Sequence, residues 1–98
     1  MNNLPPAFER FVLSLYQGSR QLYPSVPTWL ERTMRDFLNK NERFQLYDYL
    51  GELLDGSYSE AELNNIYESV DPDYHFVPTG PILQMARDIL AKIMAEAN

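Results

Sequence analysis

Cysteine is absent from this 98-residue sequence, and so is any long apolar run. Without thiols the chain cannot build a disulfide scaffold, a thiolate zinc site, an iron–sulfur cluster or a cysteine nucleophile. No apolar run approaches the ~18–20 residues that a membrane span needs, and the first residues lack the basic-then-apolar plan of a secretory signal. We therefore expect a soluble, cytoplasmic protein that has no membrane partner.

Residues that carry catalysis or bind cofactors are also scarce. His75 is the only histidine, and there is no glycine-rich phosphate loop, His/Glu metal pair or nucleophile elbow. Asp71 and Asp73 flank Pro72, a pattern more typical of a turn than of a general acid and base. The same stretch lacks the glycine and glutamate that a calcium loop requires. We expect a non-enzymatic protein with no catalytic residue, metal, cofactor or small-molecule substrate.

Positive charge is missing from the centre of the chain. The sequence has 8 Lys and Arg against 14 Asp and Glu, which gives a net charge of −6, and no Lys or Arg occurs over residues 44–86. Eight acids lie in that stretch: Asp48, Glu52, Asp55, Glu60, Glu62, Glu68, Asp71 and Asp73. A surface that only needs to be soluble usually mixes positive and negative side chains. The absence of Lys and Arg from this stretch therefore indicates a negative electrostatic field that serves binding. Such a field opposes nucleic acid and favours a cationic partner.

The apolar residues are sufficient for one core. The sequence is 45% hydrophobic and 13% aromatic, which predicts one domain over residues 1–98 that folds without metals or disulfides. Apolar positions recur every three or four residues rather than every second residue. We therefore predict an all-α fold, a compact bundle of about five helices.

Cap signals and apolar stripes place the helices in the first half. A first helix is predicted over 6–22, with Tyr16 on its apolar stripe. A second helix, ending near residue 39, would begin with the capping-box pair Thr28 and Glu31.

A third helix is predicted over 42–55, with Asn41 as its N-cap and Gly56 as its stop. Its expected core stripe consists of Phe44, Tyr47, Leu50 and Leu54. The pair Ser59 and Glu62 would cap a fourth helix that ends at Asp71 and Pro72, and the sequence Thr79-Gly80-Pro81 would open the last helix.

Acidic and aromatic residues on the third predicted helix suggest a binding surface. Asp48, Glu52 and Asp55 share one stripe beside Tyr49, and their mutual repulsion costs a few tenths of a kcal/mol per pair. Tyr49, Tyr58 and Tyr74 lie in or beside acidic stretches. Rigid aromatics among charges are typical of protein-binding hot spots, although partial burial in the core is an equal alternative for each. Tyr16, Tyr47 and Tyr67 lie on apolar stripes and are predicted to be core residues.

Three segments together resemble a known family. Residues 57–63, then Asp73-Tyr74-His75-Phe76, then residues 80–83 opening the last helix are similar in order to the acidic helix, aspartate–tyrosine loop and closing helix of colicin-type immunity proteins. The resemblance covers about 40 residues and excludes residues 1–41. With residues 44–50, the chain resembles the immunity proteins of bacterial contact-dependent growth inhibition systems.

The resemblance implies a function for the acidic residues. Immunity proteins of these families bind a cationic nuclease toxin inside the producing bacterial cell, over or beside its nucleic-acid site. The acidic helix would correspond to Glu60, Glu62 and Glu68, and the loop to Asp73 and Tyr74. Here a single tyrosine follows Asp73, which departs from the family pattern.

The first hypothesis is therefore an immunity protein whose partner is a basic toxin domain, a ribonuclease such as a tRNA-cleaving toxin. The predicted toxin-binding residues are Asp48, Tyr49, Glu52, Asp55, Tyr58, Glu60, Glu62, Glu68, Asp71, Asp73 and Tyr74. The first alternative is an acidic adaptor that recognises another cytosolic protein through an apolar groove. The second is an enzyme built on carboxylates.

Overall fold

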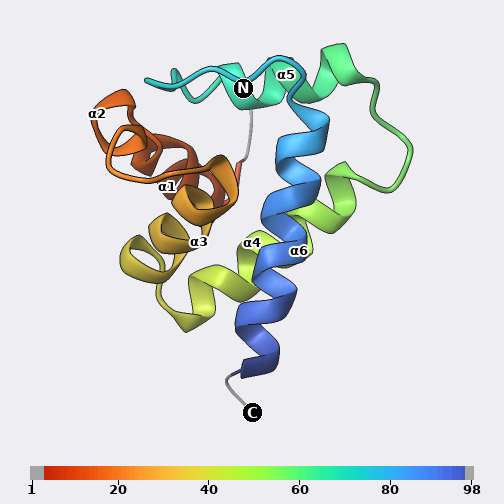
Figure 1. The fold of residues 1–98 in the computed structure, drawn as a ribbon. Helices are drawn as coiled ribbons and strands as arrows, with labels where there is room; N and C mark the ends of the chain where they lie inside the picture. The colour runs from red at the N-terminus through yellow and green to blue at the C-terminus, as the bar shows by residue number, and fades with distance from the viewer. Residues whose placement is uncertain (1–3, 97–98) are drawn as a thin grey trace.

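A computed structural model describes residues 4–96, and over this range it contains helices and no strand. The helices are α1 (Pro6–Ser14), α2 (Gln17–Arg20), α3 (Val26–Phe37), α4 (Lys40–Leu53), α5 (Glu60–Glu68) and α6 (Gly80–Glu96). Figure 1 shows their arrangement. Five of them are longer than two turns and α2 is a single turn, so the predicted all-α bundle of about five helices is confirmed.

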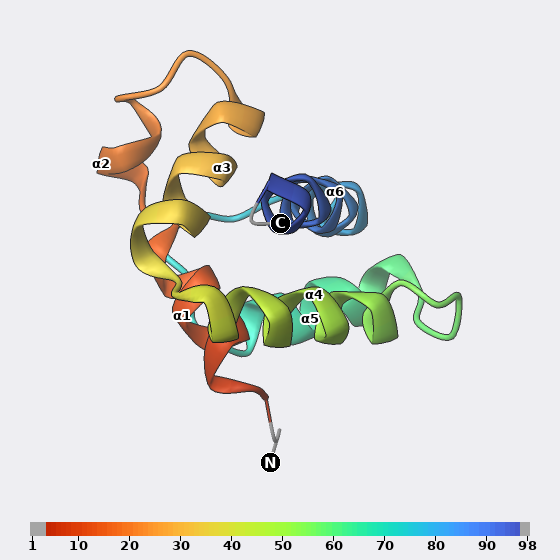
Figure 2. The same cartoon turned by 90° about the horizontal axis from the view of Figure 1, so that it is seen from below.

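The long helix α6 organises the packing. It crosses α4 on one side and packs against α3 on another, while α1 lies against both α3 and α4 (Figures 1 and 2). Helix α5 lies at the end of the bundle where α6 begins (Figure 1). The radius of gyration of 12.6 Å is that of a compact chain of this length. Within residues 4–96 no helix is long and apolar enough to cross a membrane.

One hydrophobic cluster joins the five longer helices. Its largest fully buried side chains include Trp29, Tyr67 and Phe8, and Phe76 joins it from the loop before α6. The indole Nε1 of Trp29 donates a hydrogen bond of 2.9 Å to Ser19 Oγ, which ties α2 to α3. The buried indole N–H is thereby satisfied, as burial of a polar group requires.

The first predicted helix is wrong in its second half. Leu15 and Tyr16 adopt extended backbone angles and separate α1 from α2. The break leaves Leu15 fully buried while Tyr16 keeps 44% exposure, so Tyr16 is not a core residue. Asp73 stabilises the restart, because its carboxylate accepts a hydrogen bond of 2.9 Å from the backbone N–H of Gln17.

The predicted caps of α3 and α4 are each misplaced by two or three residues. Helix α3 begins after Ser25, whose hydroxyl accepts from the Thr28 N–H, so Thr28 is not its cap. Helix α4 begins after Asn39 instead of Asn41. Asn39 and Glu42 form a capping box with hydrogen bonds of 2.8 and 2.9 Å.

The ends of α5 are closer to expectation. The capping box of Ser59 and Glu62 is confirmed, with hydrogen bonds of 2.8 and 3.1 Å. The helix ends at Glu68, three residues before Asp71, whose φ of 63° is left-handed. The predicted stop of α4 at Gly56 is too late, because α4 ends at Leu53 with Leu54 as its C-cap; Gly56, with a positive φ of 101°, lies in the turn that follows.

The core face of α4 differs from the predicted stripe. Its buried residues are Leu46, Leu50 and Leu53, and Phe44 keeps 45% exposure. Both stripes have helical spacing and share only Leu50, because apolar residues surround much of this helix. The aromatic residues Phe44 and Tyr47 therefore lie beside the core face and not on it.

Candidate functional site

The acidic side chains on the second half of α4 remain available for a partner. Asp48 and Glu52 are exposed, and within residues 4–96 neither forms a hydrogen bond or ion pair. Asp55, in the following loop, accepts hydrogen bonds from the hydroxyl and backbone N–H of Ser57. These bonds, the hydroxyl first, hold the pKa of Asp55 below its usual value and keep it ionised.

Two tyrosines accompany these acids. Tyr49 is half-buried, with its ring edge-on to Phe8 at a centroid distance of 5.1 Å. Burial chiefly raises the pKa of Tyr49, and the charges of Tyr58 and Glu52 raise it further, which places both near its hydroxyl. Tyr58 itself is 42% exposed.

We call these five residues of α4 and the loop after it the α4 acidic patch: Asp48, Tyr49, Glu52, Asp55 and Tyr58. The patch combines Tyr49, which is packed on Phe8, with two acids, Asp48 and Glu52, that have no partner among residues 4–96.

Two of the predicted binding acids on α5 have structural hydrogen bonds. The carboxylate of Glu60 accepts from the backbone N–H groups of Thr79 (2.6 Å) and Gly80 (2.8 Å) at the start of α6. A side chain at Gly80 would collide with it, because an added Cβ would lie 2.7 Å from Glu60 Oε1. Glu62 forms the capping box of α5 with Ser59. Both acids thus satisfy helix N-termini.

Of the three acids around the loop before α6, two contact other parts of the fold and one is exposed. Glu68 lies 2.8 Å from Nδ1 of His75, and Asp73 holds the start of α2. Asp71 is exposed, and within the described residues it has no side-chain hydrogen bond. No interaction among the described residues joins Asp71 to the α4 acidic patch.

Tyr74 belongs to an aromatic cluster under this loop. Its ring lies 4.8 Å from Trp29 and 5.0 Å from Phe76, and its carbonyl accepts a 2.6 Å hydrogen bond from the hydroxyl of Tyr67. Tyr67 is fully buried, as predicted, and burial raises its pKa above the usual value, with smaller effects from the charges of Glu68 and Tyr74. Tyr74 is thus largely committed to the fold.

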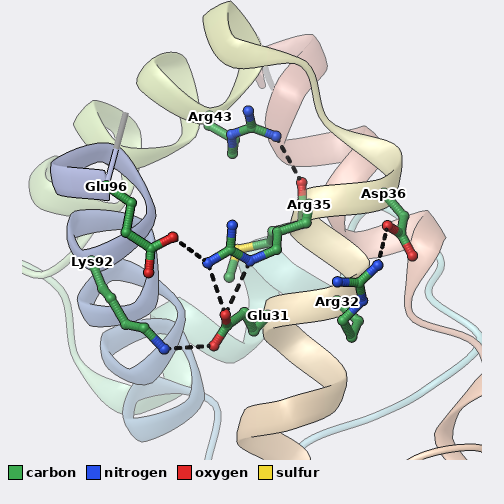
Figure 3. Close-up of polar contacts among 8 residues, drawn as sticks. Glu31, Arg32, Arg35, Asp36, Arg43, Lys92 and Glu96 are labelled. Carbon is green, nitrogen blue, oxygen red and sulfur yellow. Dashed lines mark hydrogen bonds and ion pairs between the residues drawn. The ribbon is translucent and has the colours of Figure 1, made fainter. Parts of the chain in front are cut away.

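The positive charges are mostly neutralised or bonded within the molecule, which the sequence did not reveal. On α3, Glu31 accepts from Arg35 (2.9 Å) and from Lys92 of α6 (3.0 Å), and Arg35 also contacts Glu96 (2.6 Å). Figure 3 shows this network between the two helices. The hydrogen bonds from Lys92 and Arg35 lower the pKa of Glu31.

Seven of the eight cations have such partners within residues 4–96, and Lys40 is the exception. Arg87 donates from Nε to the Tyr47 carbonyl (3.1 Å) and lies 3.9 Å from the Tyr47 ring centroid. Gly51 leaves room for this guanidinium, because a Cβ there would lie 2.7 Å from Arg87 Nη2 and the arginine would have to shift. Within residues 4–96, Asp48, Glu52 and Asp55 of the α4 acidic patch form no ion pair, and Arg87 beside Gly51 bonds to neutral groups of Tyr47.

Within residues 4–96 no three acidic or histidine side chains gather closely enough to hold a metal ion. No family model, curated protein or solved structure matches the chain.

Proposed function

We propose that the protein is a non-enzymatic immunity protein that binds and neutralises a cationic nuclease toxin. The expected toxin is a ribonuclease, such as a tRNA-cleaving toxin of a contact-dependent inhibition system. One observation carries the proposal. Asp48 and Glu52 of the α4 acidic patch are exposed and unpaired within the described residues, beside Tyr49 and Tyr58, while almost every cation is engaged internally.

The negative charge of this patch is complementary to the positive charge of a nuclease's nucleic-acid site. A nuclease presents Lys and Arg where it holds phosphates, and an unbalanced acidic face accelerates encounter with such a surface. Tyr49 is fixed against Phe8, so its exposed part is pre-organised and loses little entropy on binding. The inhibitor would then present negative charge where the toxin binds its substrate.

Contacts within the fold occupy several of the residues that the sequence predicted to bind the toxin. Glu60, Glu62 and Asp73 stabilise helix starts, and Tyr74 packs in the aromatic cluster. We therefore assign toxin contact primarily to the α4 acidic patch.

The test uses purified ribonuclease toxin domains from contact-dependent inhibition systems, with tRNA cleavage as the readout. Wild-type protein should inhibit one of them. The variant Asp48→Asn/Glu52→Gln should bind that toxin at least about tenfold more weakly, because it removes two charges from the contact. The matched control Glu9→Gln/Asp88→Asn removes two exposed acids elsewhere and should keep most of the affinity.

Equal affinity in the wild type and both variants would contradict the proposal. Salt titration then separates the alternatives. A partner held equally at low and high salt would favour the adaptor hypothesis, since apolar contacts are little screened. Turnover of a substrate by the protein alone would favour the enzyme hypothesis.

A further inference from the structure

An apolar pocket lies between the N-terminal half of α4 and the C-terminal half of α6. Its volume is about 470 Å³, which is within the usual range for small-molecule sites. Its principal lining residues are Lys40, Arg43, Phe44, Tyr47, Ile93 and Met94. Two alanines of α6, Ala91 and Ala95, complete the lining, and none of the described residues that line it is acidic.

The packing of α4 and α6 explains the pocket. The two helices are in contact at Gly51, where the guanidinium of Arg87 lies against α4 and donates to the Tyr47 carbonyl. Figure 1 shows the two helices crossing and separating toward the C-terminus of α6. Beyond the crossing, Phe44 and Tyr47 of α4 stand opposite Ala91 and Ala95 of α6, and the small side chains leave a hollow.

The pocket carries positive charge in a protein whose net charge is −6. Lys40 is exposed and has no ion pair within residues 4–96. Arg43 donates from Nη1 to the carbonyls of Met34 and Leu38 at the end of α3, and Figure 3 draws one of these two bonds. Its Nε and Nη2 have no partner among the described residues, so one edge of the guanidinium remains able to bind an anion.

We propose that this pocket binds a single-chain amphipathic carboxylate, such as a medium-chain fatty acid. The carboxylate would pair with Lys40 and the free edge of Arg43, whose fork geometry suits a carboxylate. The tail would lie against Phe44, Tyr47 and Met94. The half-exposed ring of Phe44 supplies an apolar wall that no residue of the described chain covers. The site lies outside the α4 acidic patch and is independent of the proposed immunity function.

The test is titration of the full chain with dodecanoate, followed by calorimetry and by amide chemical shifts. We expect saturable one-to-one binding with shifts concentrated around Phe44 and Met94. The variant Lys40→Gln should bind about tenfold more weakly, as loss of a charge-assisted contact implies. The control Arg32→Gln removes an equal charge from the exposed pair with Asp36 and should leave the affinity unchanged.

Two further measurements test whether the ligand occupies this pocket and whether its carboxylate is needed. Ala91→Phe fills the pocket from an exposed helix position and should abolish binding, with circular dichroism and thermal melting verifying the fold. Dodecanol, which keeps the tail and lacks the charge, should bind at least tenfold more weakly. Absent or multi-site dodecanoate binding would overturn the proposal, as would equal binding by dodecanol or by Ala91→Phe. A Phe-containing acidic peptide that binds there when dodecanoate does not would equally overturn it.

Discussion

Glu60 connects the first turn of α5 to the first turn of α6. Its two oxygens accept separate backbone N–H groups, those of Thr79 and Gly80, at 2.6 and 2.8 Å. Such N–H groups have no partner within their own helix, and a carboxylate also interacts favourably with the positive end of the helix dipole. A single acidic side chain thus positions the longest helix relative to its neighbour.

Replacement of Glu60 should therefore destabilise the fold. Glu60→Ala removes both hydrogen bonds and should lower the free energy of unfolding by about 1–2 kcal/mol, the usual cost of losing an N-cap. Glu60→Gln keeps one acceptor oxygen and should lose less. Urea denaturation followed by circular dichroism measures both. The control Glu52→Ala, at an exposed acid that has no partner in the described part of the chain, should stay within about 0.5 kcal/mol of wild type, and an equal loss there would refute the assignment.

Contact between α3 and α6 combines buried apolar residues with the ion-pair network around Glu31. Leu30 and Met34 of α3 and Leu90 of α6 belong to the same hydrophobic cluster. At the edge of this contact, the Glu31 carboxylate forms ion pairs with Arg35 of its own helix and with Lys92 of α6. Figure 3 shows that the carboxylate lies between the two cations.

The network predicts how stability depends on pH. The pKa of Glu31 is lowered in the folded state, first by Lys92 and then by Arg35, so its contribution is fully present above its ordinary pKa of 4.5. The contribution disappears as the pH falls through the lowered value. Glu31→Gln should cost about 0.5–1 kcal/mol at pH 7, because a partly exposed pair is screened, and almost nothing in strong acid.

Thermal or urea unfolding at a series of pH values measures this difference. The control is Asp36→Asn, which breaks only the exposed pair with Arg32, at 3.0 Å within α3. It should give a smaller effect at pH 7. A Glu31→Gln penalty that is constant across the pH range would show that the loss arises from packing and not from charge.

The helices were predictable as elements, but their ends and faces were less so. Ser59 with Glu62 fits the capping rule directly before the apolar stripe that begins at Leu63, so the start of α5 was predicted correctly. At α4, Asn39 and Asn41 are both acceptable caps, and only Asn39 has an acidic residue three positions later. The break at Tyr16 depends on Asp73, a residue far along the chain, and no local pattern reports it.

At the scale of the whole molecule, the sequence predicted where the negative charge lies but not which acids make contacts within the fold. The sequence shows that residues 44–86 contain only acids among their charged residues other than His75. It does not show that Glu60 and Asp73 are bonded to helix starts, because those contacts require the tertiary fold. Within residues 4–96 every cation except Lys40 has an internal partner, whereas Asp48 and Glu52 have none.

This asymmetry predicts oriented adsorption to a positively charged surface. A cationic resin should bind the molecule preferentially through the α4 acidic patch, because the patch holds three acids within a stretch, residues 44–86, that contains no Lys or Arg. On anion-exchange chromatography at pH 7, Asp48→Asn/Glu52→Gln should therefore elute at lower salt than Glu9→Gln/Asp88→Asn, although both lose two negative charges. Equal elution of the two variants would mean that only net charge governs adsorption. The patch would then have no special field with which to attract a basic partner.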